Sequence, residues 1–223
     1  MKLTLFLILS SLVLSVAPAS ANEKSNVRFL AASLPDGLGE VTWLAGKTEG
    51  EPIGLSTEQL SAPVMLPERA FILQTGADKR PLATITLPAE GESFVVLPAG
   101  EPAGTLKPFV LPTTDPAFGG GDVFLFNSSD GKLFGKLGSS DFELAPLEGK
   151  AVRPGGDLSA GSYPVEFNVR EEAGDRVLRT LRWPVQTRSR SYCFFVKNPA
   201  KDRIEFRTVD EFVEPAKKAG KER

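Results

Sequence analysis

Hydrophobic and polar side chains alternate most clearly in the stretch LATITLP at residues 82–88. Ala83, Ile85 and Leu87 are separated by threonines. Successive side chains of a β-strand point to opposite faces, so this period of two predicts a strand with one buried face and one exposed, β-branched face. The apolar run just before it predicts a hairpin partner, with the turn at residues 76–79.

Two further runs, FVVL at 94–97 and YCFFV at 192–196, are apolar on both faces. This pattern is typical of central strands that are covered on each side. The chain has 18 prolines and 21 glycines, which argue against long helices. A short helical turn is predicted only at residues 56–60. The sequence therefore predicts an all-β protein.

The strand pattern occurs twice. Residues 70–88 align with residues 166–184 without a gap, at a spacing of 96, and the opening strands at 27–33 and 123–129 have the same spacing. Aligned pairs include Phe71 with Phe167, Leu73 with Val169, Leu82 with Leu178, and Pro88 with Pro184. After the second proline we expect a spacing of 98, which places 93–97 opposite 191–195. We interpret the ordered matches as a tandem duplication.

The predicted fold is two tandem immunoglobulin-like or transthyretin-like β-sandwiches related by this duplication. The second hairpin is expected to turn at residues 172–175. The expected organisation is a signal peptide at 1–21, a first repeat at 26–112, a linker at 113–121, a second repeat at 122–212 and a flexible tail at 213–223.

The first repeat opens with VRFLAASLPDG, which resembles uncharacterised bacterial exported tandem β-sandwich repeats that open Val-Arg-x-x-x-Ala-Ser-Pro-Asp. The matching residues are Val27, Arg28, Ala32, Ser33, Pro35 and Asp36. Leu34 is inserted before the proline, and the histidine that precedes the Ala-Ser pair in that pattern is missing. The resemblance implies the architecture and an exported location, and it implies no chemistry.

The N-terminus has the features of a signal peptide. Lys2 precedes an apolar run at residues 3–16, and Ala19-Ser20-Ala21 fits the cleavage rule. We expect an exported protein, periplasmic or extracellular, without a membrane span after cleavage. The formal net charge is −2 and becomes −3 once Lys2 is removed, which argues against nucleic acid as a partner. The oligomeric state is left open.

The absence of histidine excludes Ser-His-Asp and Cys-His nucleophiles and imidazole metal sites. The single cysteine, Cys193, is predicted to be buried and unreactive. The sequence NSSDG at 127–131 is interpreted as a turn rather than a calcium loop, because it lacks acidic oxygens at alternate positions. We therefore expect no metal, no cofactor and no enzymatic activity.

Charge is what most distinguishes the repeats. Residues 177–201 contain six basic and no acidic residues, whereas residues 81–105 contain three acidic and no basic ones. We predict that Arg182, Arg188 and Arg190 converge, with Arg179 nearby, to dock an anionic partner such as an envelope protein or an anionic cell-surface polymer. The alternative is a solvated basic hairpin without a partner.

The predicted function is a non-catalytic binding or scaffolding module at the bacterial cell envelope. One alternative is a carbohydrate-binding accessory protein, for which Trp43 and Tyr163 would line a concave face. Another is a carboxylate-based hydrolase, for which pairs such as Glu90/Glu92 or Glu171/Glu172 would have to converge across a cleft.

Overall fold

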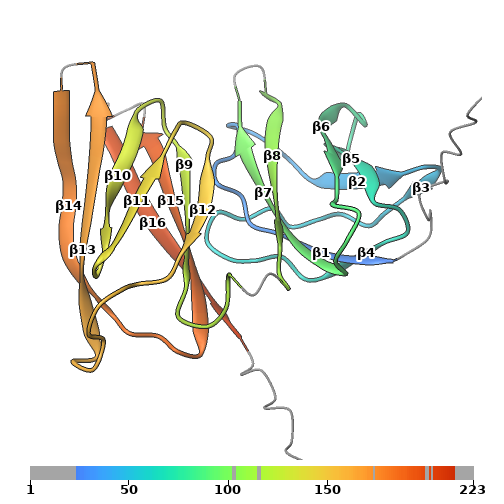
Figure 1. The fold of residues 1–223 in the computed structure, drawn as a ribbon. Coiled ribbons are helices and arrows are strands. Elements are labelled where there is room, and N and C mark those ends of the chain that lie inside the picture. Colours follow the sequence, from blue (N-terminus) through green and yellow to red (C-terminus); the bar gives the residue numbers. More distant parts are fainter. Residues whose placement is uncertain are drawn as a thin grey trace, which may run out of the picture.

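The computed structural model describes residues 24–101, 104–114, 117–172, 174–198, 201 and 203–213. These residues form sixteen β-strands in four four-stranded sheets, and they contain no α-helix (Figure 1). The protein is all-β, as predicted. The predicted helical turn at 56–60 is wrong: residues 57–59 form a bend without helical hydrogen bonding. The expected signal peptide and most of the expected tail lie outside the described residues.

The first half of the chain forms two sheets with the strand orders β3-β2-β5-β6 and β4-β1-β7-β8. The strands are β1 (Ser25–Phe29), β2 (Val41–Ala45), β3 (Thr48–Glu49), β4 (Val64–Leu66), β5 (Ala70–Thr75), β6 (Pro81–Thr86), β7 (Ser93–Gly100) and β8 (Leu106–Pro112). β1 and β7 are parallel, and the other neighbouring strands are antiparallel.

The second half forms two sheets with the orders β11-β10-β13-β14 and β12-β9-β15-β16. The strands are β9 (Val123–Ser128), β10 (Lys132–Leu137), β11 (Ser140–Leu144), β12 (Gly149–Val152), β13 (Ser162–Glu171), β14 (Gly174–Pro184), β15 (Ser189–Asn198) and β16 (Arg203–Phe212). Adding eight to each strand number of the first half reproduces these orders, including the parallel pair β9 and β15.

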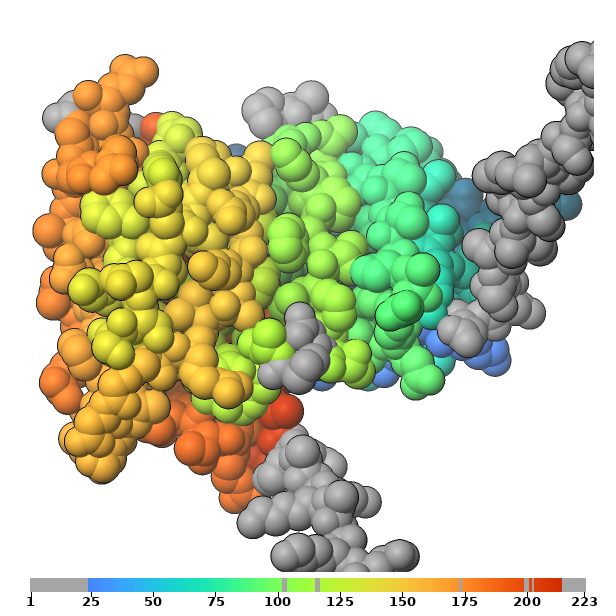
Figure 2. Space-filling model, in the orientation of Figure 1, coloured from blue at the N-terminus to red at the C-terminus, as the bar shows by residue number. Residues whose placement is uncertain are grey.

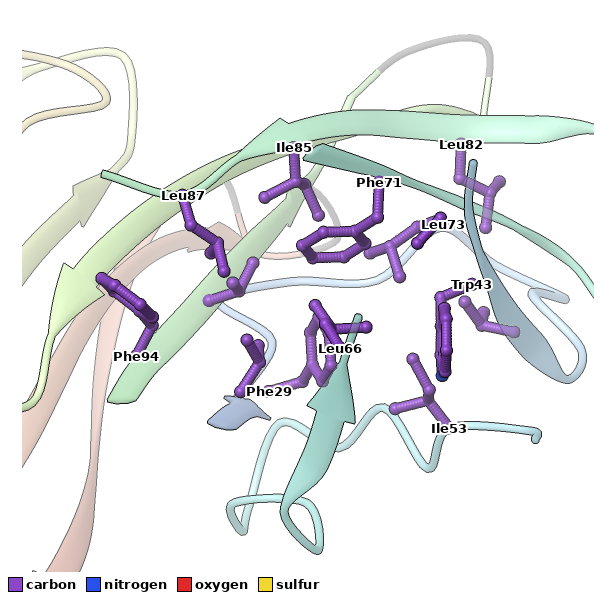
Figure 3. Close-up of a cluster of buried hydrophobic side chains, with 14 of the residues drawn as sticks. Phe29, Trp43, Ile53, Leu66, Phe71, Leu73, Leu82, Ile85, Leu87 and Phe94 are labelled. Carbon is purple, nitrogen blue, oxygen red and sulfur yellow. The ribbon is translucent and has the colours of Figure 1, made fainter. Parts of the chain in front are cut away.

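Each half has its own apolar core between its two sheets. In the first half, Phe29, Phe71 and Leu73 lie in a cluster with Trp43, which points inward beside Ile53 (Figure 3). The alternation predicted at residues 82–88 is confirmed for Ile85 and Leu87, which are buried in this cluster, whereas Ala83 is only partly buried and Leu82 is buried instead, next to a shift in the β5–β6 register. The core of the second half is built around Phe167 and Phe195, whose rings meet edge to face at 4.8 Å.

A third core joins the two halves. The β4-β1-β7-β8 sheet packs against the β12-β9-β15-β16 sheet, so the four sheets lie in layers across the molecule (Figure 1). This interface core consists of Leu30, Ala32, Val95, Leu97, Ala99, Leu111, Phe118, Phe124, Phe126, Tyr192, Phe194 and Val209. Figure 2 shows the halves in contact along a broad boundary. The runs at 94–97 and 192–196 are therefore central strands covered on both faces, as predicted.

The expected spacing of 98 for these central strands is wrong by one residue. Val27 pairs with Phe94, whereas its counterpart Val123 pairs with Ser191, which is a spacing of 97. Val95 faces the interface core, but Cys193 faces the core of the second half. A shift of one residue moves a strand side chain to the opposite face of the sheet. The longer loop of the second half thus has one extra residue rather than two.

The predicted hairpin turns differ in outcome. At residues 76–79 the turn is confirmed, because the amide of Thr75 donates to the carbonyl of Arg80 at 3.0 Å. At residues 172–175 the prediction is two residues too long, since Gly174 pairs with Glu171 and already begins β14. Because β14 already begins at Gly174, the exposed edge of this sheet is longer than predicted.

The segment expected to be a linker is anchored within the interface core. Phe118 exposes only 1% of its surface and meets the rings of Phe124 and Tyr192 edge to face, at 5.8 and 5.2 Å. Asp122 is also buried and forms a two-hydrogen-bond ion pair with Arg153, at 2.7 and 2.8 Å. The chain between the halves thus contributes to their packing.

Candidate functional site

Arg190 does not belong to an exposed patch, which corrects the prediction for this residue. It exposes 4% of its surface. Its Nε donates to Glu211 at 2.7 Å, and its Nη1 donates to the carbonyls of Thr113 and Phe118 at 3.0 and 3.1 Å. The guanidinium also lies 4.7 Å from the centre of the Phe118 ring. Its donors are used to hold the segment that connects the halves, so it cannot bind an external anion.

Glu211 is the centre of this buried cluster. It also accepts a hydrogen bond from the Tyr192 hydroxyl at 2.6 Å and forms an ion pair with Arg28 at 3.0 Å. Burial alone would raise the pKa of Glu211, but the hydrogen bonds from Arg190 and Tyr192 outweigh that cost and hold it below its usual value. The cluster links β1, β15 and β16 and is structural.

Arg182 and Arg188 are exposed, and among the described residues each contacts only neutral groups. Arg182 donates to the hydroxyl and carbonyl of Ser162 at 3.0 to 3.2 Å. Arg188 lies over the ring of Phe212 at 5.6 Å. The structure thus places the three predicted site residues in three separate environments, with two of them at the surface.

Arg179 adds a third exposed cation. Its strand partner across β13 is Phe167, so it lies on the inner side of its sheet. There it borders a surface groove of about 390 Å³ between β14 and β16, together with Leu178 and Phe206. Within the described ranges it has no hydrogen bond or ion pair. Its exposure at the free edge explains how a charged side chain occupies an inward position.

The neighbouring arginines of the same hairpin are neutralised. Arg170 forms two hydrogen bonds with Asp175, and Arg176 forms two with Glu171. Among the residues that the structure describes, Arg179, Arg182 and Arg188 therefore form a stretch of exposed arginines without a carboxylate partner. We call these three residues, two on β14 and one in the connection from β14 to β15, the β14 arginines. β14 is an edge strand, and its free edge lies at the side of the molecule (Figure 1).

A small pocket of about 110 Å³ opens next to this strand, at the end of the second sheet pair. Tyr163 and Trp183 form aromatic walls, with their rings edge to face at 6.4 Å. Ser191 donates to Asp210 at 2.6 Å, and Gln186 donates to the other oxygen of Asp210 at 3.3 Å. The lining residues are Gly121, Val123, Tyr163, Trp183, Pro184, Gln186, Ser189, Ser191, Thr208 and Asp210.

The polar side of this pocket could not be found from sequence. Asp210 is brought to Ser191 by the pairing of β15 with β16, a contact across 19 residues. The carbohydrate-binding face expected from Trp43 and Tyr163 does not exist, because these side chains are buried in the cores of different halves. Trp183 aligns with the inward Leu87 at the spacing of 96, which predicts a buried side chain, but it is partly exposed in the pocket.

The acidic residues do not form a site for glycoside hydrolysis where the structure describes them. A surface cleft of about 690 Å³ contains Asp130, Glu171 and Glu172, but Lys197 binds Asp130 and Arg176 binds Glu171. The hydrogen bond from Lys197 lowers the pKa of Asp130, whereas a general acid needs a raised pKa. The described residues contain no cluster of three or more potential metal ligands.

Asn127 and Cys193, the other candidate residues, lie in positions where they stabilise the fold. Asn127 is buried, and its amide donates to the carbonyl of Gly131 at 2.8 Å, which stabilises the turn predicted at 127–131. Cys193 is fully buried, as predicted, and burial raises the pKa of its thiol. Both observations fit packing roles.

No protein-family model matches this chain, and a search of curated proteins finds no match either. In the described part of the chain, no helix has the length and hydrophobicity needed to cross a membrane. The function is therefore inferred from the chemistry of the surface itself.

Proposed function

We propose that this protein is a non-catalytic binding or scaffolding module, exported to the periplasm or the exterior of a bacterial cell, that docks an anionic partner at the cell envelope. The observation that carries the proposal is the set of β14 arginines. They are exposed, close in sequence and without carboxylate partners in the described residues. The partner that fits them is an acidic envelope protein or an anionic surface polymer.

Unpaired arginines suit this role for two physical reasons. A guanidinium binds carboxylate or phosphate through two parallel hydrogen bonds, so it recognises shape as well as charge. A pair of charges 4 Å apart in water gains only about 1 kcal/mol, so several arginines must act together to hold a partner. Arg170 and Arg176 are already neutralised, so they add little to this attraction.

The proposal includes the origin and type of the fold. We infer that the two halves are immunoglobulin-like or transthyretin-like β-sandwiches produced by tandem duplication, as in the exported bacterial repeats that the opening VRFLAASLPDG resembles. The identical strand order in both halves supports this inference. The basic surface of the second half would then be a specialisation of one copy.

The interface core joins the two halves of the proposed module into one body. Phe109 from the first half contacts Phe124 and Phe126 from the second, each at 5.6 Å between ring centres. Arg207 donates across the same boundary to the carbonyl of Ala31 at 2.7 Å. A charged surface on a rigid body loses little conformational entropy on binding, which suits a scaffold.

The test is retention on a heparin column at increasing salt. The variant Arg179→Ser/Arg182→Ser/Arg188→Ser should elute at clearly lower salt than the wild type. Retention of the wild type should weaken with salt, because the Debye length is about 10 Å at 0.1 M and shorter above it. Arg190 is left unchanged because it is buried.

The matched control is Lys47→Ser/Lys107→Ser/Lys150→Ser, which removes the same charge from exposed positions elsewhere. It should elute close to the wild type. Equal losses in the two triple variants would show that net charge alone causes retention and would refute a docking site on β14. Circular dichroism should show that all three proteins are folded, because exposed charges contribute little to stability.

A further inference from the structure

The pocket next to β14 is lined by a hydroxyl that has no hydrogen-bond partner among the described residues. Tyr163 exposes 5% of its surface and lines the pocket. Its hydroxyl makes no hydrogen bond to any residue within the described ranges. Burial raises the pKa of Tyr163 to about 12, so the hydroxyl keeps its proton at physiological pH. The hydroxyl oxygen is accessible from the pocket, so it can donate a hydrogen bond to an external group.

The opposite wall provides acceptors. Asp210 already accepts hydrogen bonds from Ser191 and Gln186, and no cation pairs with it in the part of the chain that the structure describes. An ionised carboxylate can accept about four hydrogen bonds, so two positions remain for a ligand. Thr208 contributes a further hydroxyl to the lining. The pocket lining therefore includes one neutral donor and one charged acceptor.

These groups restrict the class of ligand. An anionic group would be repelled by Asp210, and an apolar group would leave both Asp210 and Tyr163 unpaired. A ring that bears neighbouring hydroxyls can donate hydrogen bonds to Asp210 and accept one from Tyr163. The apolar C–H groups of the same ring can pack on the indole of Trp183. The volume of about 110 Å³ is below the 300–1,000 Å³ typical of pockets for whole small molecules, so it suits a single ring.

We propose that this pocket binds one sugar unit of a carbohydrate, with Asp210 accepting hydrogen bonds from its hydroxyls, Tyr163 donating one, and Trp183 providing an apolar wall. This site is separate from the β14 arginines, which recognise anions. Arg182 and Arg188 lie just before and just after the segment that forms its rim, so one chain of an acidic polysaccharide could contact both.

The test is a titration with methyl glucoside, methyl galactoside, methyl mannoside and N-acetylglucosamine, followed by NMR of the two tryptophan indole N–H signals. Trp183 lines the pocket and Trp43 is buried in the other half, so Trp43 is an internal reference. At least one sugar should shift the Trp183 signal and leave the Trp43 signal unchanged. Cyclohexanol, a ring with one hydroxyl, should shift neither.

Two variants test the assigned roles. Tyr163→Phe should weaken sugar binding several-fold and leave thermal unfolding unchanged, because its hydroxyl has no protein partner. Asp210→Asn should weaken binding about tenfold, since hydrogen bonds to a charged acceptor are the stronger ones. Asp141→Asn, on the exposed strand β11, is the matched control and should bind like the wild type.

Failure of this proposal is distinguishable from failure of anion docking. No selective Trp183 shift with any of the four sugars, or unchanged binding in both Tyr163→Phe and Asp210→Asn, would overturn it. The triple β14 arginine variant should retain the sugar-induced shift, and Tyr163→Phe should retain its binding to heparin.

Discussion

Replacement of Arg190 by methionine tests whether the buried ionic cluster holds the two halves together. Methionine approximates the length of the arginine side chain but removes its charge and donors. The variant loses the ion pair with Glu211 and leaves the carbonyls of Thr113 and Phe118 without these donors. Removing one partner of a buried ion pair costs about 3–5 kcal/mol. The free energy of unfolding of a native protein is about 5–15 kcal/mol, so this loss would be a large part of its stability.

The measurement is urea unfolding of Arg190→Met and the wild type, followed by circular dichroism and tryptophan fluorescence. Trp43 reports on the first half and Trp183 on the second. Arg182→Met is the control, because a substitution at an exposed position usually changes stability by less than about 0.5 kcal/mol. Similar unfolding midpoints for the two variants would refute the argument that Arg190 is buried and paired.

The same cluster predicts a dependence on pH. The pKa of Glu211 in the folded protein lies below the ordinary value of 4.5, so its contribution to stability is complete above that value. It is lost as pH falls through the lower, folded pKa, when the carboxylate is protonated. The loss of stability on acidification should be smaller in Arg190→Met, which lacks the main hydrogen bond that lowers this pKa. An equal pH dependence in both proteins would contradict this assignment.

Two further substitutions test the packing. Phe118→Ala should destabilise the protein by about 3–5 kcal/mol, because it removes a buried ring from the interface core; a loss below about 1 kcal/mol in urea unfolding would mean that this segment does not pack there. Cys193→Val should cost less than about 1.5 kcal/mol as a near volume-conserving replacement, and the native thiol should react slowly with a thiol reagent; rapid labelling would show that Cys193 is accessible.

The order of hydrophobic and polar residues was sufficient to predict the strands and the faces of several of them. The alternation at 82–88 placed Ile85 and Leu87 correctly, because a strand with one buried face must repeat every two residues, but the register shift beside Ala83 buries Leu82 out of that phase. The runs at 94–97 and 192–196 indicated cover on both faces. The sequence pattern does not identify what packs on the second face of these strands, because any apolar surface could cover it. In the structure, the other half of the chain covers that face.

Which residues form the functional surface depended on tertiary structure more than the positions of the strands did. A run of arginines predicts positive charge, but exposure is decided by distant partners: Glu211 lies 21 residues from Arg190 and buries it, whereas Arg182 meets only Ser162. The spacing of residues 93–97 and 191–195 was misjudged by one, and only strand pairing revealed the face of Cys193. The pocket likewise exists because β15 and β16 bring Ser191 and Asp210 together beside Trp183. Sequence periodicity thus determined which residues are in strands, and long-range packing decided which charges and hydroxyls remain available to a partner, because burial depends on contacts that are not local in the chain.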